Sequence, residues 1–185
     1  MRTEQYLAAI LDELNRVREA VAGEPAEELA EAILEARKVF VAGAGRSGLM
    51  GRAFAMRLMH LGVDAYVPGD TVTPALGAGD LLLAGSGSGE TKSLTAMAQK
   101  AKSLSARVAL VTVARESTLG RLADLTVTLP GAAKEETGLQ RSTVQPMGSL
   151  FEQTLLLFYD ALLLRLMEKT GVDGAAMMSR HANLE

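Results

Sequence analysis

The sequence contains no cysteine and no tryptophan among its 185 residues, and aromatic residues make up only 4% of it. Without cysteine, the chain can form no disulfide bond, no thiolate nucleophile and no cysteine-ligated metal site. The formal net charge is −3. A chain with neither an excess of positive charge nor many aromatic rings lacks the usual means of binding nucleic acid. We therefore expect no nucleic-acid partner and no thiol chemistry.

Long uninterrupted apolar runs are also missing. The most apolar region, residues 150–167, is interrupted by polar or charged side chains at Glu152, Gln153, Asp160 and Arg165. A membrane span needs about 20 predominantly apolar residues with few charges, so this region predicts a deeply buried or subunit-interface helix and no membrane association. The N-terminal residues lack the apolar core of a signal peptide. Together with the absence of cysteine, this favours a cytoplasmic protein.

What the chain does contain is a regular alternation of short apolar segments and helical patterns. Hydrophobic residues make up 48% of the 185 residues, which is enough for one domain with a sizeable core. The spacing predicts strands over residues 38–42, 63–67, 80–84, 107–113 and 124–129. It predicts helices over residues 4–22, 26–36, 49–61, 92–104, 117–122 and 149–170. The single domain 1–185 then divides into N-terminal helices (1–36), a parallel α/β core (37–130) and a C-terminal part (131–185) with a loop, a long apolar helix and an irregular tail.

Strands that alternate with helices are typical of a parallel sheet with helices on both faces. We therefore expect an α/β fold, a three-layer αβα sandwich around a five-stranded parallel sheet. In such sheets, ligands bind beyond the carboxyl ends of the strands, near the point at which the strand order reverses. Two glycine-rich loops, residues 43–48 and 86–91, follow predicted strands, so we expect both to line one crevice.

The loop of residues 86–91 reads SGSGET and stands between an apolar strand and a predicted helix. Glycines allow the backbone to turn tightly and a ligand to approach closely. A helix start offers free N–H groups and the positive end of the helix dipole, and the hydroxyls of Ser86, Ser88 and Thr91 add further donors. The pattern predicts a site for a phosphate ester, although a tight Gly/Ser turn without a ligand has the same composition.

The loop of residues 43–48 reads GAGRSG and matches the dinucleotide-binding pattern G-x-G-x-x-G. Asp70, after the next predicted strand, stands where an acid could hold a ribose. Arg46 and Ser47 favour a different ligand, because they place a cation and a hydroxyl in the variable positions of the pattern. With a second phosphate-type loop present, a phosphosugar site is the preferred interpretation and a dinucleotide site the alternative.

The pairing of residues 42–47 (AGAGRS) with residues 86–91 (SGSGET) resembles the sugar isomerase (SIS) domain family. That resemblance implies a flavodoxin-like sheet that binds phosphosugars. Three further segments are similar to the 6-phospho-3-hexuloisomerase members of this family: residues 54–62 (FAMRLMHLG), 145–153 (QPMGSLFEQ) and 180–185 (RHANLE). The resemblance extends from about residue 5 to the end of the chain.

The resemblance implies an isomerase, an intramolecular oxidoreductase that interconverts D-arabino-hex-3-ulose 6-phosphate and D-fructose 6-phosphate in the ribulose monophosphate pathway of formaldehyde assimilation. A phosphorylated ketohexose is then the expected substrate, and neither a metal nor a cofactor is expected, because the reaction only moves protons. For Arg46, a solvated loop charge is the alternative to substrate binding. The substrate-binding residues expected from the two loops are Gly45, Arg46, Ser47, Ser86, Gly87, Ser88 and Thr91.

Moving a carbonyl between C3 and C2 of a ketose phosphate needs a base that removes a proton from one carbon and returns it to the other. It also needs donors that stabilise an enediolate and a group that carries the hydroxyl proton. Glu152 is the candidate base, because it begins an apolar helix after a Gly/Pro loop and the resemblance places the base at this position. The alternative is a capping box, in which Glu152 bonds back to the Ser149 N–H.

The chain has two histidines, His60 and His181, and both are candidate catalytic residues because imidazole exchanges protons near neutral pH. His60 falls at the end of a predicted helix, where a capping role is as well supported as catalysis. His181 lies in a tail that would fray unless docked. The resemblance implies docking at an active site, its own or a neighbouring subunit's, and an undocked surface histidine is the alternative.

Two functions from different classes remain open on the sequence. The isomerase uses Glu152 and His181, whereas a non-catalytic phosphosugar-binding module, a sensor or regulator, would share the loops and need neither residue. The apolar surfaces of the helices over residues 4–22 and 149–170 favour a homo-oligomer. We expect a dimer or a homotetramer, with active sites shared between subunits as one option.

Overall fold

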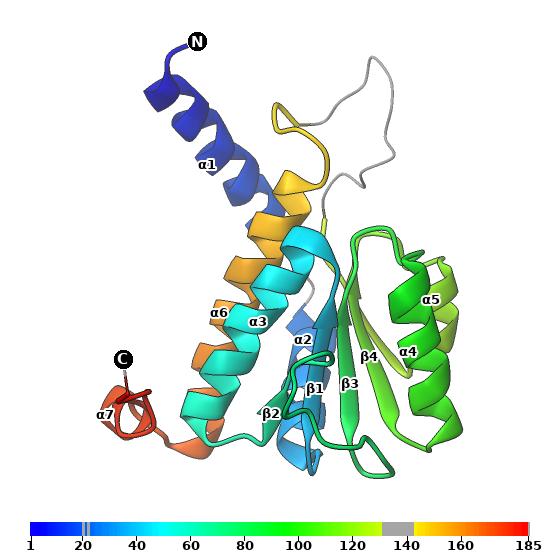
Figure 1. Ribbon diagram of the computed structural model, residues 1–185. Helices are drawn as coiled ribbons and strands as arrows, with labels where there is room; N and C mark the ends of the chain where they lie inside the picture. Colours follow the sequence, from blue (N-terminus) through cyan, green and yellow to red (C-terminus); the bar gives the residue numbers. More distant parts are fainter. Residues whose placement is uncertain (20, 22, 131–142, 185) are drawn as a thin grey trace.

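The computed structural model describes residues 1–19, 21, 23–130 and 143–184 (Figure 1). Five parallel strands form one sheet in the order β2-β1-β3-β4-β5. The predicted five-stranded parallel sheet is therefore confirmed, and its strand order is that of flavodoxin-like folds. The strands are β1 (Val39–Gly43), β2 (Ala65–Tyr66), β3 (Leu81–Gly85), β4 (Arg107–Thr112) and β5 (Leu125–Thr128).

The strand order reverses between β1 and β3, which are neighbours in the sheet although β2 lies between them in the sequence. Their register pairs Val39 with Leu81 at one end and Gly43 with Gly85 at the other. Both strands therefore end at the same level, each on a glycine. Loops that leave these two ends start side by side, at the place where such sheets bind ligands.

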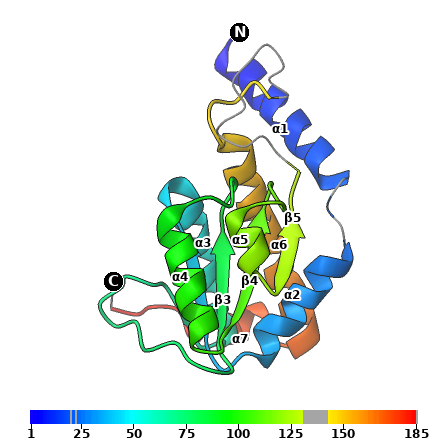
Figure 2. The same ribbon diagram turned by 90° about the vertical axis from the view of Figure 1, so that its right-hand side faces the viewer.

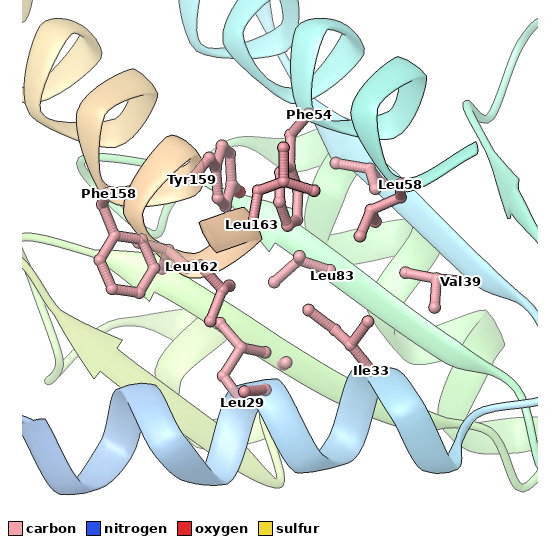
Figure 3. Close-up of a cluster of buried hydrophobic side chains, with 14 of the residues drawn as sticks. Leu29, Ile33, Val39, Phe54, Leu58, Leu83, Phe158, Tyr159, Leu162 and Leu163 are labelled. Carbon is pink, nitrogen blue, oxygen red and sulfur yellow. The ribbon is translucent and has the colours of Figure 1, made fainter. Parts of the chain in front are cut away.

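Helices cover both faces of the sheet, which confirms the three-layer sandwich (Figures 1 and 2). One face packs on α2 (Gly23–Glu35), α3 (Gly45–Leu61) and α6 (Ser149–Thr170), and the other on α4 (Lys92–Ser103) and α5 (Thr118–Leu122). Strand side chains alternate between the two cores: Val39 and Leu83 lie among α2, α3 and α6 (Figure 3), whereas Phe40 and Leu82 lie against α4. Burial on both faces explains why the strands are almost wholly apolar.

The N-terminal helix α1 (Thr3–Glu19) projects from the body and contacts mainly the start of α6 (Figure 1). Val17, near its C-terminal end, is buried, whereas Tyr6, Leu7 and Leu11 are about half exposed. The predicted amphipathic helix is present, but most of its apolar side faces away from the sheet. Of the two N-terminal helices, α2 covers the sheet and α1 does not.

Three elements differ clearly from the sequence expectations. Helix α3 begins at Gly45 and not at residue 49, so residues 45–48 of the expected glycine loop form its first turn. Strand β2 has two residues, because Gly62 ends α3 in the left-handed conformation (φ 100°) and the Val63 N–H still bonds to the Leu58 carbonyl. The C-terminal tail was expected to hold no regular element, but it forms a short helix, α7 (Gly174–Met178). Asp173 caps α7 by accepting a hydrogen bond from the Ala176 N–H (2.8 Å).

Part of the predicted loop over residues 131–148, namely residues 131–142, lies outside the described residues. Its last part, residues 143–148, is described and leads directly into α6. Within the described parts of the chain, no helix is both long and apolar enough to cross a membrane.

Candidate active site

A pocket of about 130 Å³ opens between the carboxyl ends of β1 and β3. Its walls come from the loop after each of these strands and from the first turn of α6. The pocket therefore lies at the reversal of strand order, as the sequence predicts, and Glu152 lines it as well. Six of the seven predicted binding residues line it: Gly45, Ser47, Ser86, Gly87, Ser88 and Thr91.

The first loop depends on close backbone packing between Gly43 and Gly48. A Cβ atom on Gly43 would lie 2.8 Å from the Gly48 Cα, and one on Gly48 would lie 2.7 Å from the Gly43 oxygen. Glycine at both positions thus lets the chain turn from β1 into α3 within two residues. Gly45 has a positive φ (56°) and open space around it. Because no side chain caps α3, its first N–H groups remain available to an anion.

The second loop is held by its own hydroxyls. Ser86 Oγ accepts a hydrogen bond from the Gly89 N–H (3.2 Å) and lies 3.4 Å from Thr91 Oγ1. Ser88 Oγ accepts from the Glu90 N–H (3.2 Å). Gly89 turns the loop with a φ of 65°. The loop therefore converges on the start of α4, which no side chain caps, and presents hydroxyl and N–H donors to the pocket.

Glu152 lies in the first turn of α6 and forms an ion pair with Arg46, with 2.8 Å between Oε2 and Nε. The Glu152 side chain is 5% exposed and that of Arg46 57% exposed. Arg46 is thus not a free loop charge, since its guanidinium compensates a buried carboxylate. The capping box does not form either, because Ser149 is already a helical residue and its N–H bonds to the Pro146 carbonyl (3.2 Å).

The two histidines pack against each other, with 5.2 Å between ring centroids. His60 is buried near the end of α3, and Arg180 docks the tail by donating to the His60 carbonyl (3.1 Å). The tail is therefore docked on the C-terminal end of α3, while His181 itself is exposed. Burial, His181 and the nearby Arg57 lower the pKa of His60 below its ordinary value.

This docking place is at the other end of α3 from the pocket (Figure 1). Gly45 begins the helix at the pocket and His60 lies near its end, so the two are about 22 Å apart at 1.5 Å per residue. One chain therefore brings together Glu152, Arg46 and the two loops. It does not bring His60 or His181 to the same pocket.

Some residues that line the pocket are not among those the sequence predicts. Phe151 lies directly under the second loop, since a Cβ on Gly87 would be 3.1 Å from its ring. Gly148 also lines the pocket. Both residues lie close to Glu152 within residues 145–153. Their closeness in sequence to the candidate base is therefore the signal that could have identified them. Asp70, the acid proposed for a ribose, is paired with Arg52 (2.9 Å). In the described part of the chain, no group of three His, Asp or Glu residues is placed to hold a metal ion.

Fold and site together define a doubly wound α/β domain with a pocket at its switch point, two loops rich in glycine and hydroxyl groups around it, and a buried carboxylate in its wall. Residues 32–159 match the model of the SIS domain family. The chain belongs to the SIS domain family, and the dinucleotide alternative is set aside.

Several relatives are similar to this chain over almost their whole length. The 3-hexulose-6-phosphate isomerase of Bacillus subtilis is 54% identical over 185 residues, which is 100% of both chains. The enzyme of the same name from Mycobacterium gastri is 45% identical over 97% of this chain and 89% of its own. A Methanococcus jannaschii protein, whose crystal structure infers a molecular function of 3-hexulose-6-phosphate isomerase, superimposes with a TM-score of 0.85 at 32% identity, covering 98% of this chain and 99% of that one.

Proposed function

We propose that this chain is an isomerase that interconverts D-arabino-hex-3-ulose 6-phosphate and D-fructose 6-phosphate. Full-length similarity to relatives that carry the name 3-hexulose-6-phosphate isomerase supports the reaction. The observation that carries the proposal is Glu152, a buried carboxylate that lines a pocket whose other lining residues are mostly glycine, serine and threonine. A pocket that only bound a phosphosugar would have no need of a buried acid there.

The two loops divide the work of binding in this proposal. Ser86, Gly87, Ser88 and Thr91 hold the 6-phosphate, because their hydroxyls and the free start of α4 offer donors to an anion. Gly45, Arg46 and Ser47 hold hydroxyls nearer the reacting carbons. Fixing the phosphate end places C2 and C3 near Glu152, and such positioning is itself a large part of catalysis.

The proton then moves between two adjacent carbons. The Glu152 carboxylate takes the proton from C2 of the 3-ketose, the C2–H electrons form a C2=C3 double bond, and the C3 carbonyl oxygen gains the negative charge. Arg46 and the N–H groups at the start of α3 stabilise this enediolate. Glu152 returns the proton to C3, while the hydroxyl proton on O2 passes to O3 through a second group. No atom is gained or lost.

We assign the role of this second group to His181, whose ring packs against that of His60. Because this pair lies at the far end of α3, it can serve only the pocket of a neighbouring subunit. His181 is exposed and able to reach a partner, whereas His60 is buried and supports its ring. The lowered pKa of His60 keeps the His60 imidazole neutral near pH 7, so it packs against His181 as an uncharged ring.

We infer that the partner is a second copy of this chain, in a dimer or tetramer. An apolar groove of about 470 Å³ runs between α1 and α6, and Leu11, Leu157 and Phe158 are among its lining residues. Leu11 and Leu157 are each 52% exposed, and contiguous exposed apolar surface is typical of subunit contacts. Multi-angle light scattering tests this, with Leu157→Glu expected to shift the mass toward the monomer. A wild-type monomer would contradict it.

We place the enzyme in the cytoplasm and in the ribulose monophosphate pathway. The pathway follows from the substrate, which forms when formaldehyde condenses with ribulose 5-phosphate. The lack of cysteine fits a reducing compartment.

A coupled assay tests the function. It supplies 3-hexulose 6-phosphate, made in situ from formaldehyde and ribulose 5-phosphate, and follows fructose 6-phosphate. Rapid product formation that depends on this protein is expected. Saturable binding of fructose 6-phosphate without any turnover would instead favour the non-catalytic phosphosugar sensor.

A further inference from the structure

A second buried carboxylate, outside the pocket, belongs to Glu13 on α1. The Glu13 residue is only 4% exposed although most of α1 stands free of the body. Burial of a carboxylate is unfavourable unless hydrogen bonds or ions compensate it. The compensation at Glu13 comes from a segment about 130 residues further along the chain, and that segment leads into the active site.

Three donors from this segment converge on Glu13. Thr143 Oγ1 donates to one carboxylate oxygen (2.6 Å), and the Gln145 side-chain amide donates to the same oxygen (2.9 Å). The Val144 N–H donates to the other oxygen (2.6 Å). The Gln145 N–H in turn donates to Thr143 Oγ1 (3.0 Å). We call Glu13 with these three residues the Glu13 clasp.

The clasp favours an ionised carboxylate, because all three partners donate and a carboxyl proton would compete with them for the same oxygens. Burial raises the pKa of Glu13, but the three hydrogen bonds and the nearby Arg16 guanidinium outweigh this and hold the pKa below its ordinary value. Hydrogen bonds to a charged acceptor are about twice as strong as those between neutral groups. The clasp is therefore a firm attachment in an otherwise lightly held region.

A short run of backbone hydrogen bonds joins the clasp to Glu152, the proposed base. The Pro146 carbonyl, next to Gln145, accepts from the Ser149 N–H (3.2 Å). The Gly148 carbonyl accepts from the Glu152 N–H (3.0 Å), and Gly148 also lines the pocket. The clasp thus fixes the point from which α6 starts.

The chain between these points is strained. Met147 has a φ of 56°, a left-handed conformation that is unfavourable for a residue with a side chain. Met147 is also 69% exposed, so packing of its side chain does not hold it there. A strained backbone persists only where its surroundings determine it, and the attachments on its two sides are the Glu13 clasp and α6.

We propose that Glu13 is a positioning residue of the isomerase, which holds the segment before α6 so that Glu152 meets the substrate in the reactive geometry. The proposal rests on the proposed function for its kinetic consequence. It gives α1 a part in the reaction although α1 does not line the pocket. Its effect is on turnover, because the loops that bind the phosphate are held separately by β1, β3 and α4.

The test compares Glu13→Gln with Asp12→Asn. Asp12 is the exposed neighbour of Glu13 on α1, so this control makes the same charge change on the same helix. A glutamine at position 13 keeps one acceptor oxygen and turns an amide donor toward the other donors. We expect Glu13→Gln to lower kcat about 30-fold and to change KM less than about 3-fold, with Asp12→Asn close to wild type.

A reciprocal exchange separates positioning from general instability. Gln145→Glu alone places two carboxylates together and is expected to lower kcat at least as much as Glu13→Gln. In the double variant, the amide at position 13 faces the carboxylate at position 145, so most of the lost turnover should return. A KM that rises by as large a factor as kcat falls would overturn the proposal. So would a double variant that turns over no faster than either single variant.

Hydrogen exchange gives a reading that does not need activity. Glu13→Gln should speed amide exchange in peptides covering residues 143–150 and leave residues 86–91 unchanged. Unchanged exchange at 143–150 overturns the clasp whatever the activity, whereas an inactive wild type with an intact clasp overturns only the proposed function. Should Glu13→Gln fail to fold, Thr143→Val removes one donor at nearly constant shape and should give the same pattern, and Thr143→Ser should behave as wild type.

Discussion

At its first turn, α3 meets the loop after β3 and the buried acid of α6; at its last turn, it meets the C-terminal tail. The first end is enclosed: Glu152 is 5% exposed, paired with Arg46, and surrounded by backbone turns that only glycine allows. The other end is open, with His181 exposed beside the buried His60. The residues predicted for one reaction therefore lie in two places. Glu152 and Arg46 lie at the enclosed end, and His60 and His181 lie at the open end.

In the proposed reaction, this difference separates the two proton transfers rather than binding from chemistry. The pocket end contains what is needed to hold a phosphosugar and remove a carbon-bound proton. The tail end contains His181, the proton carrier of the proposed reaction, with no pocket beside it in the same chain. A helix of this length keeps its ends about 22 Å apart, so the proposed reaction requires another copy of the chain to bring the two together.

The largest effect is expected at the enclosed end. Glu152→Gln removes the base but keeps the size of the side chain, so kcat should fall about 1,000-fold. Binding of fructose 6-phosphate should stay within about 3-fold of wild type, because the loops that hold the phosphate are unchanged. Steady-state kinetics and calorimetry measure the two quantities. Glu168→Gln, an exposed change on the same helix, is the control, and full activity of Glu152→Gln would refute the assignment of the base.

The next effect is expected at the open end. His181→Asn removes the proton carrier and should lower kcat about 100-fold, with little change in melting temperature because the side chain is exposed. Asn183→Ala, two residues away on the tail, should have no effect. If both variants turn over at the wild-type rate, the tail has no part in the reaction and the two ends of α3 are functionally unrelated.

The backbone packing of the enclosed end can be tested by a pair of glycine variants. Gly43→Ala puts a Cβ 2.8 Å from the Gly48 backbone, and such overpacking should lower the free energy of unfolding by about 2–3 kcal/mol. Gly45→Ala meets no atom within 4 Å and is disfavoured only by its φ of 56°, which should cost about 1 kcal/mol. Denaturant titration measures both, and the reverse order would show that the turn is not packed in this way.

The smallest effect concerns pH at the open end. The pKa of His60 is lowered in the folded protein by burial, His181 and Arg57, so the unfolded chain binds the proton more readily. Stability from this residue is present above the unfolded value of 6.5 and is lost as pH falls through it. The melting temperature of wild type should therefore drop more between pH 7.5 and 5.5 than that of His60→Gln. Parallel curves would contradict the burial of a neutral imidazole.

The fold could be read from the sequence because its signals are local. Apolar runs such as residues 80–84 and 107–113 end at turn residues, and helical spacing fills the gaps, so strands, helices and the sandwich followed. The pocket followed as well, since both glycine loops come directly after strands whose carboxyl ends meet. Strand β2 was expected to be longer, because Gly62 looks like an ordinary loop glycine until its hydrogen bonds are known.

Contacts between distant segments could not be read in this way. Nothing in the pattern of α1 marks Glu13 as buried, because its donors lie about 130 residues away and outside any periodic element. The pairing of Arg46 with Glu152 likewise joins the first turns of two helices, α3 and α6, that no spacing relates. The separation of His60 from the pocket was foreseeable, however, since the expected helix over residues 49–61 already has the glycine loop at one end and His60 at the other.

The most direct test of the shared site mixes two inactive proteins. Subunits carrying Glu152→Gln and subunits carrying His181→Asn are combined, unfolded and refolded together to exchange partners. If each site takes Glu152 from one subunit and His181 from another, random pairing leaves about a quarter of all sites intact, and the mixture should recover about a quarter of wild-type activity. Activity that stays at the average of the two parents would contradict the account.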